Sequence, residues 1–138
     1  PITKEDFFDI ISLDYEVNEL DIAVALAERN ITELEKNLNI FFSLGKSPIS
    51  ILQFIYAYFH KLILIKLYGS NSFEARREYP FLVVSDLEKA KIQVKKWSIE
   101  QLSRATNALS LSDLKLRQSS SAFQRSVLTQ CLNKLIEI

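Results

Sequence analysis

The stretch "PISILQFIYAYFHKLILIKLY", residues 48–68, decides the fold. Apolar residues lie on nearly every side of a helix built from this stretch, and the polar stripe that contains Gln53 and Lys61 is narrow. Pro48 suits the first helical turn, because the N–H group that proline lacks would have no partner there. A helix that is apolar on nearly every side is normally surrounded by other helices. The sequence therefore predicts a central helix in an all-α bundle.

A membrane span is the alternative interpretation of the same stretch. The apolar run from Ile51 to Ile65 is interrupted by Gln53, His60 and Lys61. It is also shorter than the roughly 20 largely apolar residues that a span requires. The chain starts with "PITKEDFFDI", which lacks the basic region and the apolar run of a signal peptide. We therefore expect no membrane association and a cytoplasmic location.

Composition also favours one helical domain. The chain has 138 residues, of which 48% are hydrophobic, so it can form a sizeable core. It contains only 2 glycines and 3 prolines, which leaves little material for tight turns between strands. Methionine is absent and residue 1 is proline, so we expect a piece of a longer protein.

The rare residue types argue against several kinds of site. Cys131 is the one cysteine, which excludes a disulfide framework within the chain and makes a reducing compartment the expected one. Glycine occurs only at positions 45 and 69, so a glycine-rich phosphate loop is absent. No ligand cluster and no catalytic partner lies at a suggestive spacing from His60. We expect no metal, no cofactor and no catalytic residue, and a small enzyme using His60 is kept as an alternative.

Charge is distributed unevenly along a chain whose net charge is zero. Residues 1–50 carry ten Asp or Glu and four Lys or Arg, and residues 51–138 carry seven and thirteen. Such asymmetry indicates two faces with different partners. Ordinary solvation of helices explains the same distribution equally well.

Polar residues and glycine predict where the other helices begin and end. Asn30 is predicted to end one helix in the left-handed conformation, and Thr32 to cap the next, which Gly45 ends. Ser98 followed by Gln101 has the pattern of a capping box. With the apolar stripes between these signals, the chain is predicted to form six or seven helices.

The most basic part of the chain follows a loop with aromatic residues. Lys89, Lys95 and Lys96 lie in a predicted helix, and Tyr79 and Phe81 lie in the loop before it. Lysine can meet phosphates, and aromatic rings can stack on unpaired bases. Lysine on the outer face of a helix is also ordinary solvation. Nucleic-acid binding and a merely solvated face therefore both remain open.

Two blocks of sequence resemble one protein family. The first is "DYEVNELDIAVALAERNITELEKNLNIFFSLGKSPISILQFIYAYFHKLILIKLY", residues 14–68, where Gly45 and Pro48 mark the junction between two helices. The second is "YPFLVVSDLEKAKIQVKKWSIEQLSRATNALSLSDLKLRQ", residues 79–118, with aromatic residues around Pro80, a basic helix and a Trp-Ser start to the next helix. In this order, the blocks are similar to the C-terminal collar domain of the delta subunit of the bacterial DNA polymerase III clamp loader.

The resemblance implies an all-α collar of the post-AAA+ oligomerization type. Residues 1–13 would then be the end of the preceding AAA+ lid module, and residues 14–138 the collar domain. In the family, five subunits form a ring through their collars, and delta opens the sliding clamp without using ATP. The chain would thus belong to a DNA-directed DNA polymerase holoenzyme while contributing no catalytic residue.

The same resemblance implies the partners of the chain. The other clamp-loader subunits would bind through the collar, and primer–template DNA would lie near the loop that holds Tyr79 and Phe81 and near the lysines at 89, 95 and 96. The sliding clamp would be reached only through an N-terminal module outside this chain. A helical docking domain unrelated to replication is the alternative function.

Four residues of the second block would then have structural roles. Trp97 would anchor a helix in the bundle, and Ser98 would set the turn that follows it. Asp113 and Arg117 are four residues apart, a spacing at which an acid and a base form an ion pair on a helix. The family usually has lysine where this chain has Arg117.

Overall fold

The computed structural model describes residues 18–69 and 84–138, and both ranges are helical. Neither range contains a strand, so the prediction of an all-α bundle is confirmed. The expected module boundary after residue 13 lies outside the described residues, as do Tyr79 and Phe81. The elements are α2 (Glu19–Ala27), α3 (Ile31–Ser43), α4 (Pro48–Tyr68), α6 (Val84–Gln93), the 3-10 turn η1 (Val94–Lys96), α7 (Ile99–Gln118) and α8 (Ser121–Glu137).

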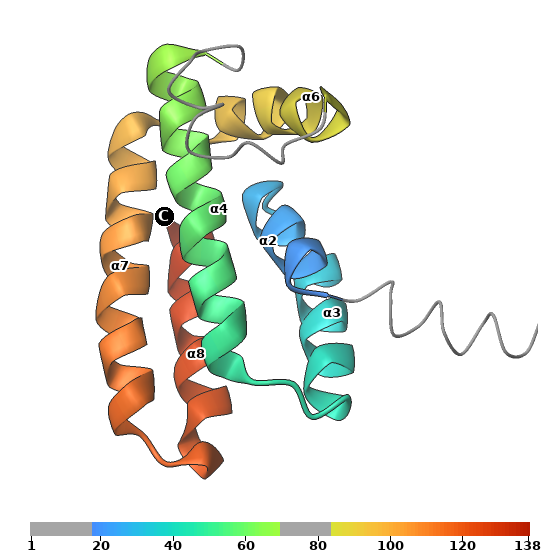
Figure 1. Ribbon diagram of the computed structural model, residues 1–138, viewed down its shortest axis with the longest axis vertical. Coiled ribbons are helices and arrows are strands. Elements are labelled where there is room, and N and C mark those ends of the chain that lie inside the picture. The colour runs from blue at the N-terminus through green and yellow to red at the C-terminus, as the bar shows by residue number, and fades with distance from the viewer. Residues whose placement is uncertain (1–17, 70–83) are drawn as a thin grey trace, which may run out of the picture.

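Helix α4 is the central element, as its sequence predicts. It contacts α7 and α8 on one side and α2 on the other, and α6 crosses one end of the bundle (Figure 1). Its buried apolar side chains are Ile51, Leu52, Ile55, Tyr58, Phe59, Leu62 and Ile65.

Two features of α4 differ from the prediction. Lys61, assigned to the polar stripe, is only 4% exposed, and its ammonium group lies 3.8 Å from the centre of the Tyr58 ring. The long methylene stem of lysine packs easily against apolar neighbours, so helical position alone does not fix its burial. Phe54 and Leu67 are exposed, so the helices described do not enclose α4 on every side.

By length and composition alone, α4 could also cross a membrane. No other helix within residues 18–69 and 84–138 is both long enough and apolar enough to do so. The core helix of a soluble protein can have the same length and apolar composition. One face of α4 is buried against four other helices.

The turn between α2 and α3 corrects two predictions. The left-handed residue is Arg29, with a φ of 57°, one position before the predicted Asn30. Asn30 instead caps α3, because its side chain accepts a hydrogen bond of 3.2 Å from the backbone N–H of Glu33. Thr32 is therefore inside α3 and is not its cap. Asparagine suits both conformations, so the sequence did not distinguish between them.

The next two junctions follow the sequence signals. Gly45, with a φ of 73°, follows the end of α3, and Pro48 opens α4 after the cap Ser47. Ser98 caps α7 in a capping box: its hydroxyl accepts from Gln101 N at 3.0 Å, and its own N–H donates to Gln101 Oε1 at 2.9 Å. The predicted helix that contains Lys89, Lys95 and Lys96 is interrupted, since η1 separates α6 from an extended Trp97.

Replacement of Ser98 by alanine tests the capping box. The variant Ser98→Ala removes the acceptor for one backbone N–H group, so we expect the free energy of unfolding to fall by about 1 kcal/mol. Urea unfolding followed by circular dichroism measures the change. Ser103→Ala, on the exposed side of the same helix, is the matched control. An equal effect of the two substitutions would show that the box does not stabilise α7.

Candidate functional site

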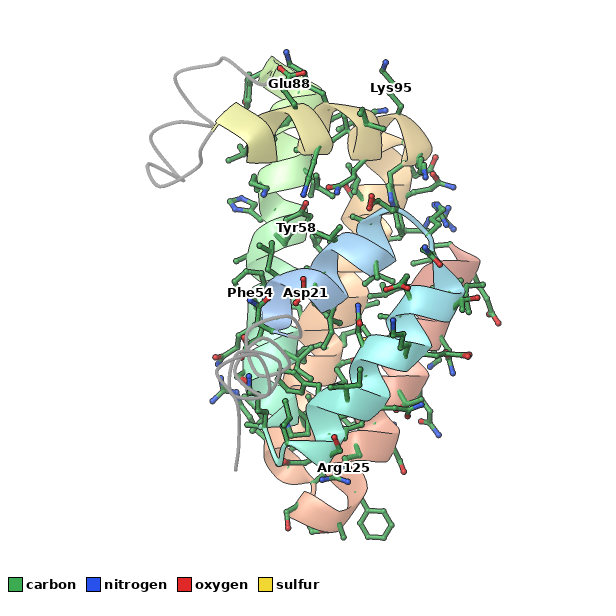
Figure 2. All side chains as sticks on the ribbon, turned by 90° about the vertical axis from the view of Figure 1, so that its right-hand side faces the viewer. Asp21, Phe54, Tyr58, Glu88, Lys95 and Arg125 are labelled. Atoms are coloured by element: carbon green, nitrogen blue, oxygen red, sulfur yellow. The ribbon has the colours of Figure 1, made fainter. Side chains whose placement is uncertain are left out.

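The three lysines predicted to face DNA occupy different surroundings. Lys95 is exposed and projects from the outer side of the α6–η1 segment (Figure 2). The ammonium group of Lys96 donates to the backbone oxygen of Glu28 at 3.0 Å, at the end of α2. Lys89 lines a groove beside α2 and α3. The structure therefore does not gather these three side chains on one free face.

The groove beside α2 and α3 carries charges of both signs. It has a volume of about 460 Å³, and its floor includes Val24 and Ile40. Its carboxylates come from Asp21, Glu28 and Glu33, and Lys36 and Lys89 face them. Because the two signs are mixed, the groove does not select strongly for either an anion or a cation.

Trp97 lies at the point where the ends of several helices meet. Its side chain is 1% exposed, and its ring N–H donates to the backbone oxygen of Ala27 at 2.8 Å. Phe59 of α4 meets the indole edge to face, with the ring centres 5.1 Å apart. The guanidinium of Arg29 covers the indole at 3.7 Å from its centre. We call Arg29, Phe59, Ala27 and Trp97 the Trp97 junction.

Arg29 extends this junction to two further elements. Its Nε donates to the backbone oxygen of Lys96, and its Nη1 donates to that of Ile136 in α8, both at 3.2 Å. Burial lowers the pKa of Arg29, although a guanidinium stays charged in proteins. Gln101 Nε2 donates to the backbone oxygen of Ile138 at 2.9 Å, which connects the start of α7 to the C-terminal end of the chain after α8.

A buried polar contact connects α6 to α4. The hydroxyl of Tyr58 donates to Gln93 Oε1, and Gln93 is almost fully buried. Among the residues that the structure describes, the Nε2 group of Gln93 has no hydrogen-bond partner. Lys66 adds a hydrogen bond of 2.9 Å to the backbone oxygen of Val94. These contacts fix α6 and η1 across the end of α4, and no sequence signal pointed to Tyr58 or Gln93.

Asp113 and Arg117 form the ion pair that their spacing predicts. Arg117 Nε lies 2.9 Å from Asp113 Oδ2 on the surface of α7. Because both side chains are partly exposed, the pair stabilises the helix by about a few tenths of a kcal/mol. Asp113 also borders a groove of about 310 Å³ between α4 and α7, together with Leu52 and Tyr56.

The residues described offer no converging set of catalytic groups. Cys131 lies in the core on α8, and burial raises the pKa of its thiol, although Ser112 and Lys134 act in the opposite sense. A protonated thiol is a weak nucleophile. Within residues 18–69 and 84–138, no three His, Cys, Asp or Glu side chains gather as metal ligands would. His60 is on α4, half-buried.

The chain was compared with protein-family models, with curated proteins and with solved structures, and none of them matches it. The helical bundle, the Trp97 junction and the grooves are therefore the features on which a functional assignment depends, together with the two sequence blocks.

Replacement of Arg29 by alanine tests the Trp97 junction. The variant Arg29→Ala removes two charge-assisted hydrogen bonds and uncovers the indole, so we expect the free energy of unfolding to fall by about 2 kcal/mol. Trp97 is the one tryptophan of the chain, so its fluorescence follows unfolding in urea directly. Its emission should also shift to longer wavelength. Arg104→Ala, on the exposed side of α7, is the matched control, and an unchanged midpoint and emission for Arg29→Ala would contradict the assignment.

The raised pKa of Cys131 gives a second prediction. Near pH 8.5, where an unperturbed thiol is half ionised, the native thiol stays protonated and buried. We expect Ellman's reagent to react much more slowly with the native chain than with the chain unfolded in urea. Because the unfolded thiol ionises first, the stability of the fold should fall as the pH rises above this value. Equal rates for the two states would contradict burial of Cys131.

Proposed function

We propose that the chain is the helical collar domain of a clamp-loader subunit of the delta type. In this role it holds delta in the ring of subunits that opens the sliding clamp and loads it onto primed DNA. The observation that carries the proposal is the resemblance of residues 14–68 and 79–118, in that order, to the delta collar.

The positions of the motifs in the fold support the proposal. Gly45 lies in the turn between α3 and α4, and Pro48 is the first residue of α4. Trp97 and Ser98 lie between η1 and α7. These residues determine where helices end and how the next helix leaves. A sequence pattern concentrated at such junctions is typical of a shared arrangement of helices.

The surface of the bundle supports a role in protein binding. Large apolar side chains are exposed on α4, α6, α7 and α8, and the buried centres of protein interfaces are rich in such side chains. In a collar, they would be covered by the neighbouring subunits of the ring. They include Leu67, Tyr68, Ile92, Leu111, Leu114 and Phe123.

Primer–template DNA is the second partner in this proposal. Lys95 is exposed, and Lys96 lies next to it with its ammonium group at the end of α2. Exposed lysines contact phosphates without reading sequence. Tyr79 and Phe81 would act from the preceding loop. The sliding clamp is bound in the family by modules that precede the collar, so we propose no direct contact between this chain and the clamp.

Copurification with the other clamp-loader subunits from the same genome tests the proposal. The chain, shown to be folded by circular dichroism, is immobilised and mixed with each purified subunit at several salt concentrations. We expect one or two of the subunits to be retained, because a ring subunit has two neighbours. A fluorescent primer–template junction tests DNA binding by anisotropy in the same buffers.

The control is a variant that keeps the exposed apolar side chains and loses the contacts of the Trp97 junction. Arg29→Ala combined with Trp97→Ala breaks the Trp97 junction, so a specific interface should be lost. Retention of no subunit by the folded wild-type chain would contradict the collar assignment and favour a docking domain unrelated to replication.

A further inference from the structure

A third groove, between α7 and α8, differs in its charge from the one beside α2 and α3. Its volume is about 210 Å³, and its apolar lining includes Ala108, Leu111 and Val127. Leu111 is 72% exposed, the highest value among the exposed large apolar side chains of the residues described. Phe123, on the first turn of α8, is exposed as well. The groove therefore presents apolar surface that the described bundle leaves uncovered.

The charged groups of this α7–α8 groove all have one sign. Lys115 and Lys134 line it, and no carboxylate does. Neither lysine takes part in the ion pairs found within residues 18–69 and 84–138. Arg104 precedes Leu111 by seven residues, or about two helical turns, which puts it on the same face of α7. An apolar strip flanked by unpaired cations is complementary to an apolar strip flanked by carboxylates.

The shape of the groove indicates the kind of segment that fits. Two packed helices leave a shallow channel, and an amphipathic helix can lay its apolar face into such a channel. Its apolar residues at spacings of three and four would contact Leu111 and Val127. Carboxylates on its flanks would meet Lys115 and Lys134. The groove beside α2 and α3 lacks this selectivity, because Lys36 and Lys89 oppose its acids.

We propose that the α7–α8 groove binds an acidic amphipathic helix of another protein. The chemistry of the site does not depend on the function proposed above. The identity of the partner does: if the chain is a collar, the helix belongs to a neighbouring clamp-loader subunit.

A synthetic peptide tests the chemistry of the groove. The probe is a fluorescein-labelled helical peptide with leucine at positions i, i+3, i+4 and i+7 and glutamate on both flanks, and its partner peptide has lysine in place of each glutamate. Anisotropy is measured with the wild-type chain at low and high salt. We expect the glutamate peptide to bind, more weakly as salt rises, and the lysine peptide not to bind. Equal binding of the two peptides would overturn the proposal.

Variants of the chain locate the binding surface. The double variant Lys115→Glu/Lys134→Glu should bind the glutamate peptide about tenfold more weakly or worse, because attraction becomes repulsion on both flanks. Leu111→Ser should also weaken binding while leaving the fold intact, since Leu111 is exposed. Lys89→Glu/Lys95→Glu makes the same change in net charge elsewhere and is the control.

Two results would place the site elsewhere. Unchanged affinity of the Lys115→Glu/Lys134→Glu variant would overturn the proposal. An equal loss in the Lys89→Glu/Lys95→Glu control would also overturn it, because the effect would then come from overall charge. Circular dichroism of each variant shows that the helices are retained.

Copurification separates the two proposals. If the wild-type chain binds the glutamate peptide but no clamp-loader subunit, the result supports an acidic-helix site in the α7–α8 groove and contradicts the collar function. If the wild-type chain and the Lys115→Glu/Lys134→Glu variant retain a subunit equally, the result supports the collar function. It also shows that the α7–α8 groove is not where that subunit binds. If the Lys115→Glu/Lys134→Glu variant loses the subunit while the wild-type chain and the Lys89→Glu/Lys95→Glu control retain it, the result supports both proposals.

Discussion

The indole of Trp97 is enclosed between Phe59 and the guanidinium of Arg29, and its N–H group donates to Ala27 O. Trp97 is the extended residue between η1 and α7, so its position fixes where α7 starts relative to the end of α2. Arg29 carries the same constraint to α8 through Ile136 O. The relative placement of α2, α4, α7 and α8 therefore depends on this one cluster. The cluster buries the apolar surface of the indole and also gives the indole N–H a hydrogen-bond partner.

Two side-chain hydrogen bonds hold α7 and α8 together at the two ends of their groove. At one end, Gln101 ties the start of α7 to the backbone oxygen of Ile138. At the other end, Gln124 Nε2 donates to Leu116 O at 3.2 Å, across the turn between the two helices. A groove whose walls are held at both ends offers a preformed surface, which lowers the entropy cost of binding.

Sequence alone predicted the features that local signals encode. Helix α4 follows from its apolar pattern, and the cap at Ser98 follows from a residue three positions away. Arg29 was missed because its partners Lys96 and Ile136 are 67 and 107 residues away. Lys89, Lys95 and Lys96 were predicted to lie in one helix, whereas η1 interrupts that helix, and Lys96 contacts the end of α2. The groove at Leu111 could not be foreseen, since it depends on how α8 lies against α7.

The single sign of charge on the α7–α8 groove limits how the chain can assemble. Two copies that met through this groove would bring lysine against lysine, and like charges at an interface cost binding energy. Its complement must therefore be a different surface, which is the arrangement of a heterologous contact. Such contacts close into rings when each member offers two unlike faces. A ring of related but distinct subunits, as proposed here, is an assembly in which an interface of one sign is an advantage, because it discourages pairing with itself.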